Sequence, residues 1–224
     1  MRINENFSVR AMVAPEQYNW VSSPQSGVER VMLDRIGEEK ARATSLVRYA
    51  KRSCFPSHMH PGGEEILVLE GTFVDEGQSF PAGWYIRNPP GSSHRPSSDE
   101  GALILVKLRQ MSTLEQTPVR VDTNDPLRWS ERNGGESCLL FDGFGEQVSI
   151  ERRRAGTRAF DHPVGGIELL ILEGSLHEGR REYKCGAWIR LPAGDCPIVT
   201  AGSGGVSFYL KTGHLTDVAV DLGT

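Results

Sequence analysis

The sequence lacks the features that mark several large classes of protein. Its four cysteines show no C-x-x-C spacing, and no apolar run approaches the length of a transmembrane helix. The residues after Met1 contain neither an apolar core segment nor a cleavage-site signature, so we expect no signal peptide. We therefore expect a cytoplasmic protein whose cysteines are reduced, buried thiols rather than disulfides.

An excess of charge of either sign is also missing. The formal net charge is -4 and the pI is about 5.9, which argues against binding to nucleic acid or to a membrane surface. Residues 152–154, three consecutive arginines, form the only dense basic patch. We interpret this patch as a solvated strand edge.

Long helical patterns are scarce, whereas turn-forming residues are abundant. The chain of 224 residues contains 25 glycines and 13 prolines, a composition that favours strands joined by turns. Short segments rich in β-forming residues fit this expectation. They are residues 44–49, 66–69, 84–87, 102–108, 147–150 and 206–211.

The chain repeats itself at an offset of 103 positions. Residues 62–71 read GGEEILVLEG and residues 165–174 read GGIELLILEG, and further glycines, prolines and an Ile-Arg pair match at the same offset without a gap. We infer a duplicated domain, because an identity series at one fixed offset indicates an internal repeat. Polar residues 112–126 lie between the two copies and are expected to connect them.

A cluster of metal-ligand residue types lies in the first copy alone. It consists of His58, His60, Glu64 and His94. Residues two apart on a strand point to the same face, so His58 and His60 share one face. The turn at residues 61–63 then places Glu64 at the start of the next strand, and His94 follows another turn. Three imidazoles and a carboxylate suit a divalent transition metal, and burying them without one is costly.

This pattern resembles the signature of the cupin superfamily, G-x5-H-x-H-x3/4-E-x6-G, followed by a second motif with the last histidine. Each ligand position and Gly71 match, whereas Arg52 and Ser53 stand where the leading glycine would lie. The sequence of residues 55–71 and 85–94 further resembles the cupin domain of ChrR-type anti-sigma factors. In that domain, the residues that correspond to the two histidines, the glutamate and the last histidine bind zinc. The resemblance is strong over residues 28–110 and weaker over the second copy.

The resemblance implies an all-β fold of two tandem cupin barrels, each a double-stranded β-helix or jelly roll, which together make a bicupin. We expect residues 1–111 to form the first barrel with the metal site, residues 112–126 the connection, and residues 127–224 a second, degenerate barrel. It also implies one divalent metal ion in the first barrel, with zinc expected and iron, manganese or nickel as alternatives.

The second copy serves as an internal control for the first. At the offset of 103, the four ligand positions become Asp161, Pro163, Ile167 and Pro197, which cannot hold a metal, and we expect Ile167 to fill the interior. Glu65 and Arg87 persist there as Glu168 and Arg190. We therefore predict that Glu65 and Arg87 serve the fold, as an ion pair, whereas Glu64 serves the metal.

Three functions remain open at this point. The first is a regulatory or sensor protein related to the ChrR cupin domain, with an ECF sigma factor or another partner chain, although the His-x3-Cys-x2-Cys motif of that family's sigma-binding domain is missing. The second is a cupin dioxygenase acting on a small organic substrate, with metal positions left open for catalysis. The third is a structural metal or a small-molecule binding module.

Two further expectations concern assembly and redox chemistry. The apolar strand at residues 66–69 is expected to be covered on both faces, which indicates tight pairing of the copies or a homodimer. Cys54 lies four residues before His58, and either an inert buried thiol or a redox-sensing role is open, the former being preferred.

Overall fold

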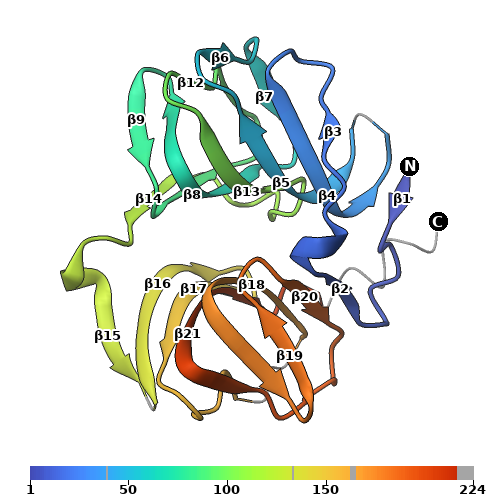
Figure 1. Ribbon diagram of the computed structural model, residues 1–224. Helices are drawn as coiled ribbons and strands as arrows, with labels where there is room; N and C mark the ends of the chain where they lie inside the picture. The colour runs from blue at the N-terminus through green and yellow to red at the C-terminus, as the bar shows by residue number, and fades with distance from the viewer. Residues whose placement is uncertain (39, 133, 162–164, 216–224) are drawn as a thin grey trace. The chain divides into compact units, whose positions relative to one another are not determined.

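Strands and turns make up nearly all of the regular structure. The computed structural model in Figure 1 describes residues 1–38, 40–132, 134–161 and 165–215. Within these residues there is no α-helix, and the helical elements are two 3-10 turns, η1 and η2. No helix in these ranges combines the length and hydropathy that a membrane crossing requires. The predicted all-β class is confirmed.

The chain divides into two compact units. The first comprises Met1–Glu5 and Asn19–Asn124, and the second comprises Asn6–Tyr18 and Asp125–Thr224. We call these units the first barrel and the second barrel.

The first barrel contains most of the strands drawn in blue and green in Figure 1. Its strands are β1 (Arg2–Ile3), β3 (Val21–Ser22), β4 (Val28–Ile36), β5 (Arg42–Tyr49), β6 (Ser53–Cys54), β7 (His58–His60), β8 (Glu64–Asp75), β9 (Gln78–Pro81), β10 (Trp84–Asn88), β11 (Ser92–His94), β12 (Ser97–Ser98), β13 (Ala102–Leu108) and β14 (Val119–Asp122).

The second barrel contains β2 (Ala11–Val13), η1 (Pro15–Gln17), η2 (Pro126–Arg128), β15 (Trp129–Arg132), β16 (Gly135–Gly143), β17 (Glu146–Arg153), β18 (Ile167–Glu178), β19 (Arg181–Lys184), β20 (Trp188–Leu191) and β21 (Thr200–Thr212).

The duplication seen in the sequence is reproduced in the strand order. The first barrel runs β4-β5-β13-β8-β10-β14 and the second runs β16-β17-β21-β18-β20-β2, so each strand of one series has a counterpart in the other. All neighbours in both series are antiparallel. The repeat therefore records a duplicated barrel.

The last strand of each series departs from the predicted boundaries. β14 lies in the segment expected to be a plain connection, yet it pairs with β10 in the first barrel. β2 lies in the part of the chain assigned to the first barrel, yet it pairs with β20 in the second. The physical reason is that an exposed sheet edge accepts any extended segment that completes its hydrogen bonds, whatever its distance along the chain.

Alternation along the strands separates interior from outer residues in the first barrel. Ile66 and Val68 on β8 join the apolar interior cluster together with Ile104 on β13. Leu67 and Leu105, on the opposite face of the same strands, are 3% and 2% exposed. The prediction that residues 66–69 form a strand covered on both faces is confirmed for β8, which extends further than predicted, to Asp75.

The repeated motif ends in a glycine in both barrels because a larger residue would clash there. Gly71 has a φ of +68°, and a Cβ at this position would lie 2.0 Å from the carbonyl oxygen of Gly101. Its counterpart Gly174 has a φ of +73°, with the carbonyl oxygen of Gly205 at 2.2 Å. Only glycine accommodates both the left-handed backbone and the close approach.

Gly71→Ala is therefore expected to destabilise the first barrel. Gly77→Ala is the matched control, because Gly77 has a φ of +80° but no atom lies within 4 Å of the position that its Cβ would take. Both variants carry the left-handed strain, and only the first adds the clash, so Gly71→Ala should cost roughly 1–3 kcal/mol more. Chemical denaturation measures the difference, and equal losses in the two variants would contradict the steric explanation.

Candidate metal centre

Two short strands bring the predicted histidines together. β7 and β11 form a separate two-stranded antiparallel sheet in which His94 lies directly opposite His58, and Ser92 opposite His60. The turn between β7 and β8 is closed by a hydrogen bond from the amide of Gly63 to the carbonyl oxygen of His60. The pairing of β7 with β11 thus brings His94 close to both histidines of β7.

All four predicted ligands converge. The donor atoms of His58, His60, Glu64 and His94 lie within 4.8 Å of one another, and the three imidazole centroids are 4.6–4.9 Å apart. Glu64 Oε2 lies 3.5 Å from His60 Nε2 and 3.4 Å from His94 Nε2. His60, Glu64 and His94 are buried, and His58 is partly exposed.

Asp75, at the end of β8, fixes the orientation of His94. Its Oδ1 lies 2.9 Å from His94 Nδ1. A carboxylate at this nitrogen keeps the proton on Nδ1, so that the lone pair of Nε2 points into the cluster. His58 is held in the same manner, with its Nδ1 2.9 Å from the carbonyl oxygen of Pro56. Neither contact was predicted from the sequence.

Asn88, the last residue of β10, holds the carboxylate. Its Nδ2 donates to Glu64 Oε2 at 3.2 Å, the same oxygen that faces His60 and His94. On the other side, Arg120 Nη2 donates to Asn88 Oδ1 at 2.6 Å, and it lies 3.6 Å from Asp75 Oδ2. Asp75, Asn88 and Arg120 therefore support the site, although no sequence motif marked them.

Burial sets the protonation states of the cluster. It lowers the pKa of His60 to about 3 and also lowers the pKa of His58, so both imidazoles are neutral at pH 7. Burial raises the pKa of Glu64 to about 7. For His94, burial is outweighed by the hydrogen bond to Asp75 and the nearby Glu64 carboxylate, and its pKa is raised.

The residues present fit a divalent metal ion. The buried Nε2 atoms of His60 and His94 have no hydrogen-bond partner in the described part of the chain, and buried polar atoms normally have one. Three imidazole nitrogens and a carboxylate oxygen are the donors that zinc, iron, manganese and nickel accept. The cluster could hold a metal ion, and its donor set does not fix which one.

The corresponding region of the second barrel is apolar. Ile167, the counterpart of Glu64, is fully buried within the apolar cluster of that barrel, as predicted. Asp161 is exposed, and Pro163, the counterpart of His60, lies outside the described residues, as does His162.

The other two histidines of the second barrel do not lie at the ligand positions. The side chain of His214 is buried and bonded to Glu168. His177 lies near the surface beside Glu182, at 3.7 Å.

The predicted ion pair between Glu65 and Arg87 is confirmed. The two residues are directly opposite on β8 and β10, and Arg87 Nη1 lies 3.0 Å from Glu65 Oε2. Arg87 also donates to Glu115 Oε2 at 2.7 Å. Since Glu64 and Glu65 alternate across the strand, one carboxylate joins the histidines and the next joins the arginine.

The expectation of buried cysteines is wrong for Cys54 and Cys185, which are exposed. Cys54 lies on β6, where the neighbouring Ser53 is the buried residue. Cys138 is buried as expected, Cys196 is intermediate, and all four thiols are free. Neighbouring residues on a strand point to opposite faces, so either Ser53 or Cys54 had to be buried. The sequence alone did not indicate which of the two it would be.

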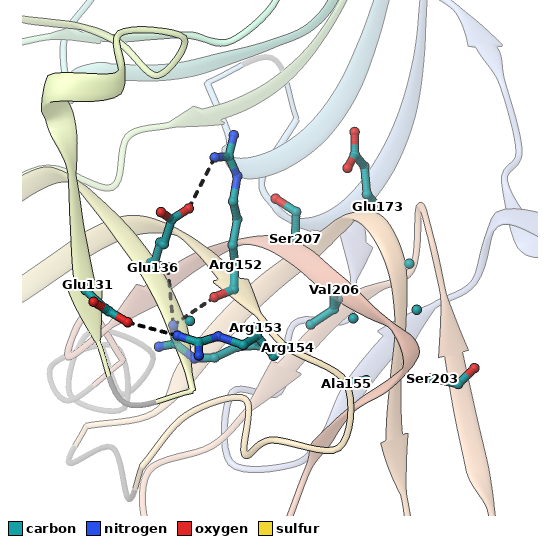
Figure 2. Close-up of a pocket in the computed structure, with 14 residues that line it drawn as sticks. Glu131, Glu136, Arg152, Arg153, Arg154, Ala155, Glu173, Ser203, Val206 and Ser207 are labelled. Carbon is teal, nitrogen blue, oxygen red and sulfur yellow. Dashed lines mark hydrogen bonds and ion pairs between the residues drawn. The ribbon is translucent and has the colours of Figure 1, made fainter.

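The arginine run at 152–154 is also not a strand edge, because β17 lies between β16 and β21. Figure 2 shows these arginines around a pocket of about 730 Å³ in the second barrel. Arg152 lies 3.5 Å from Glu136, Arg153 2.7 Å from Glu151, and Arg154 3.0 Å from Glu131. Each positive charge is matched by a carboxylate, so we assign no ligand to this pocket.

Comparisons with known proteins agree with the fold. Residues 8–112 match the family model described as the ChrR cupin-like domain. Among curated proteins, none matches the sequence at a significant level.

Three solved structures illustrate the structural likeness. Salicylate 1,2-dioxygenase from Pseudoaminobacter salicylatoxidans is 12% identical, with a TM-score of 0.65 over 96% of this chain and 87% of that one. A bacterial pirin from Escherichia coli in complex with nickel(II) is 10% identical, with a TM-score of 0.64 over 91% and 98%. A cupin 2 conserved barrel domain protein from Leptotrichia buccalis is 13% identical, with a TM-score of 0.59 over 86% and 91%.

Residues 8–112, slightly less than half of the chain, are thus similar to the ChrR cupin-like domain, and the fold of the chain is shared with these solved cupin structures. The chain therefore has a cupin-type fold of two barrels, the first of which resembles the ChrR cupin domain.

Proposed function

We propose that this protein is a metal-dependent regulatory cupin, in which occupancy of the cluster in the first barrel is the signal. The observation that carries this proposal is the buried group of His60, Glu64 and His94, joined by His58, inside the segment that matches the ChrR cupin-like domain. We propose zinc as the resident ion. Iron, manganese and nickel accept the same donors.

The arrangement of the strands suits a sensor. β7 and β11 have three residues each and form a sheet of their own, so few backbone hydrogen bonds hold them together. A bound cation would balance the negative charge of the Glu64 carboxylate and accept the imidazole nitrogens that face it. His58, His60 and His94 would then tie β7 and β11 to Glu64 on β8, and loss of the ion would loosen this small sheet.

The proposed partner is an ECF sigma factor or another protein chain. This follows from the ChrR likeness alone, and the test is direct. The chain, loaded with zinc or stripped by a chelator, is mixed with the ECF sigma factors encoded in the same genome, and complex formation is measured by light scattering. We expect at least one complex that depends on the metal. Absence of any complex in both states would contradict the sigma-factor role.

A second candidate function is a cupin dioxygenase. The observation that favours it is the partial exposure of His58 beside three buried ligands, which opens one side of the cluster to a small molecule. An open position is what distinguishes catalytic metal sites. Oxygen consumption by the iron-, manganese- or nickel-loaded protein on a panel of phenols and diketones would support this function over the first.

A further inference from the structure

Arg120 reaches the candidate metal centre from an unexpected part of the chain. It lies on β14, the strand at the end of the first barrel's series, which pairs only with β10 among the described strands. Besides Asn88, it donates to the carbonyl oxygens of Arg87 at 3.0 Å and Val119 at 2.9 Å. Arg120 is therefore fixed by three acceptors and is not a freely rotating surface side chain.

The chemistry of these contacts sets the orientation of Asn88. A guanidinium only donates hydrogen bonds, so Arg120 requires the amide oxygen of Asn88. The amide nitrogen is thereby turned towards Glu64 Oε2, to which it donates at 3.2 Å. Without Arg120 the amide can rotate, and its oxygen would then face the carboxylate oxygen and repel it.

The second barrel shows which part of this network belongs to the fold. Glu178, the counterpart of Asp75, still receives an arginine from the edge segment, since Arg10 Nη1 lies 2.7 Å from its Oε1. Asn88, however, corresponds to Leu191, and Arg120 corresponds by strand register to Met12. The second barrel, which has no metal ligands, thus keeps a contact between an arginine and the acidic residue at the end of its long strand. It has no equivalent of the Arg120–Asn88 pair.

We propose that Asn88 and Arg120 form a positioning pair that aims the Glu64 carboxylate at the metal and couples β14 to metal binding. The inference rests on the proposed function, in that the cluster must hold a divalent ion. Docking of β14 places Arg120, Arg120 orients Asn88, and Asn88 holds the oxygen that faces both imidazoles. By reciprocity, binding of the ion must stabilise the docked β14 by the same coupling.

The test uses the residues that the second barrel itself carries. Asn88→Leu and Arg120→Met are compared with wild type and with Arg48→Met, a control in the first barrel whose arginine pairs with Glu29 at the surface. Cobalt(II) is titrated into each metal-free protein, and the affinity and the d–d absorption spectrum are recorded. We expect affinity losses of about 10–100-fold for Asn88→Leu and about tenfold for Arg120→Met, each with an altered spectrum.

Hydrogen exchange provides a second readout that is independent of the affinity and the spectrum. In wild type, cobalt binding should slow the exchange of the β14 amides, and Arg120→Met should remove this effect. The positioning pair is refuted, while the metal site stands, if wild type binds cobalt but neither Asn88→Leu nor Arg120→Met alters affinity or spectrum. It is also refuted if cobalt binding leaves the exchange rate of the β14 amides unchanged. If wild type binds no cobalt, the proposed function itself fails.

Discussion

His94→Ala will abolish the stabilisation of the protein by metal. His94 supplies one of four donors and is the ligand whose orientation Asp75 enforces. In wild type, a free metal concentration of about 1,000 times Kd stabilises the native state by roughly 4 kcal/mol. That gain should raise the Tm of the first barrel by at least about 10 °C. The variant should lose about 1,000-fold or more in affinity and show no metal-dependent shift.

A matched histidine in the second barrel controls for this result. His177 lies at the surface and belongs to no ligand cluster in the described residues, so His177→Ala should keep the full shift. Differential scanning calorimetry with and without added zinc measures both variants. A metal-dependent shift that persists in His94→Ala would show that the ion binds elsewhere.

Glu64→Gln is expected to stabilise the metal-free protein while it destroys the site. Burial raises the pKa of Glu64 from 4.5 to about 7, so the folded state penalises the ionised form. The penalty is fully present above pH 7, shrinks as the pH falls through 7, and vanishes below 4.5. At pH 8, with chelator present, the variant should gain on the order of 3 kcal/mol, because one pKa unit corresponds to about 1.4 kcal/mol.

The neighbouring carboxylate gives a control of opposite sign. Glu65 pairs with Arg87, so Glu65→Gln removes one partner of a buried charge and should destabilise the protein. Its metal affinity should stay close to that of wild type. Urea denaturation at pH 8 and pH 5 measures the stabilities. If Glu65→Gln lost the metal and Glu64→Gln retained it, the assignment of the two carboxylates would be reversed.

The four ligands could be predicted because their positions depend on local rules. The two-residue period of a strand places His58 and His60 on one face, and the turn before β8 returns Glu64 to them. The internal repeat added a control within the same chain, since Ile167 and Pro197 mark positions where a ligand was lost. The same control separated Glu64 from Glu65 on the sequence alone.

The supporting residues could not be predicted, because they depend on pairings between distant strands. Asp75 reaches His94 from the far end of β8, and Arg120 reaches Asn88 from a segment with no strong strand pattern. The same reason explains the misplaced boundaries. Nothing in the short segment Ala11–Val13 indicates that it completes a sheet edge beside β20, some 175 residues later.

The most direct test of the metal centre is the metal content of the wild-type chain. The protein is purified without added metals and analysed by elemental mass spectrometry, beside His94→Ala purified in the same manner. We predict close to one divalent transition-metal ion per chain in wild type, zinc in the first instance, and none in the variant. A wild-type protein without metal, or equal metal in both, would contradict the assignment of His58, His60, Glu64 and His94 as its ligands.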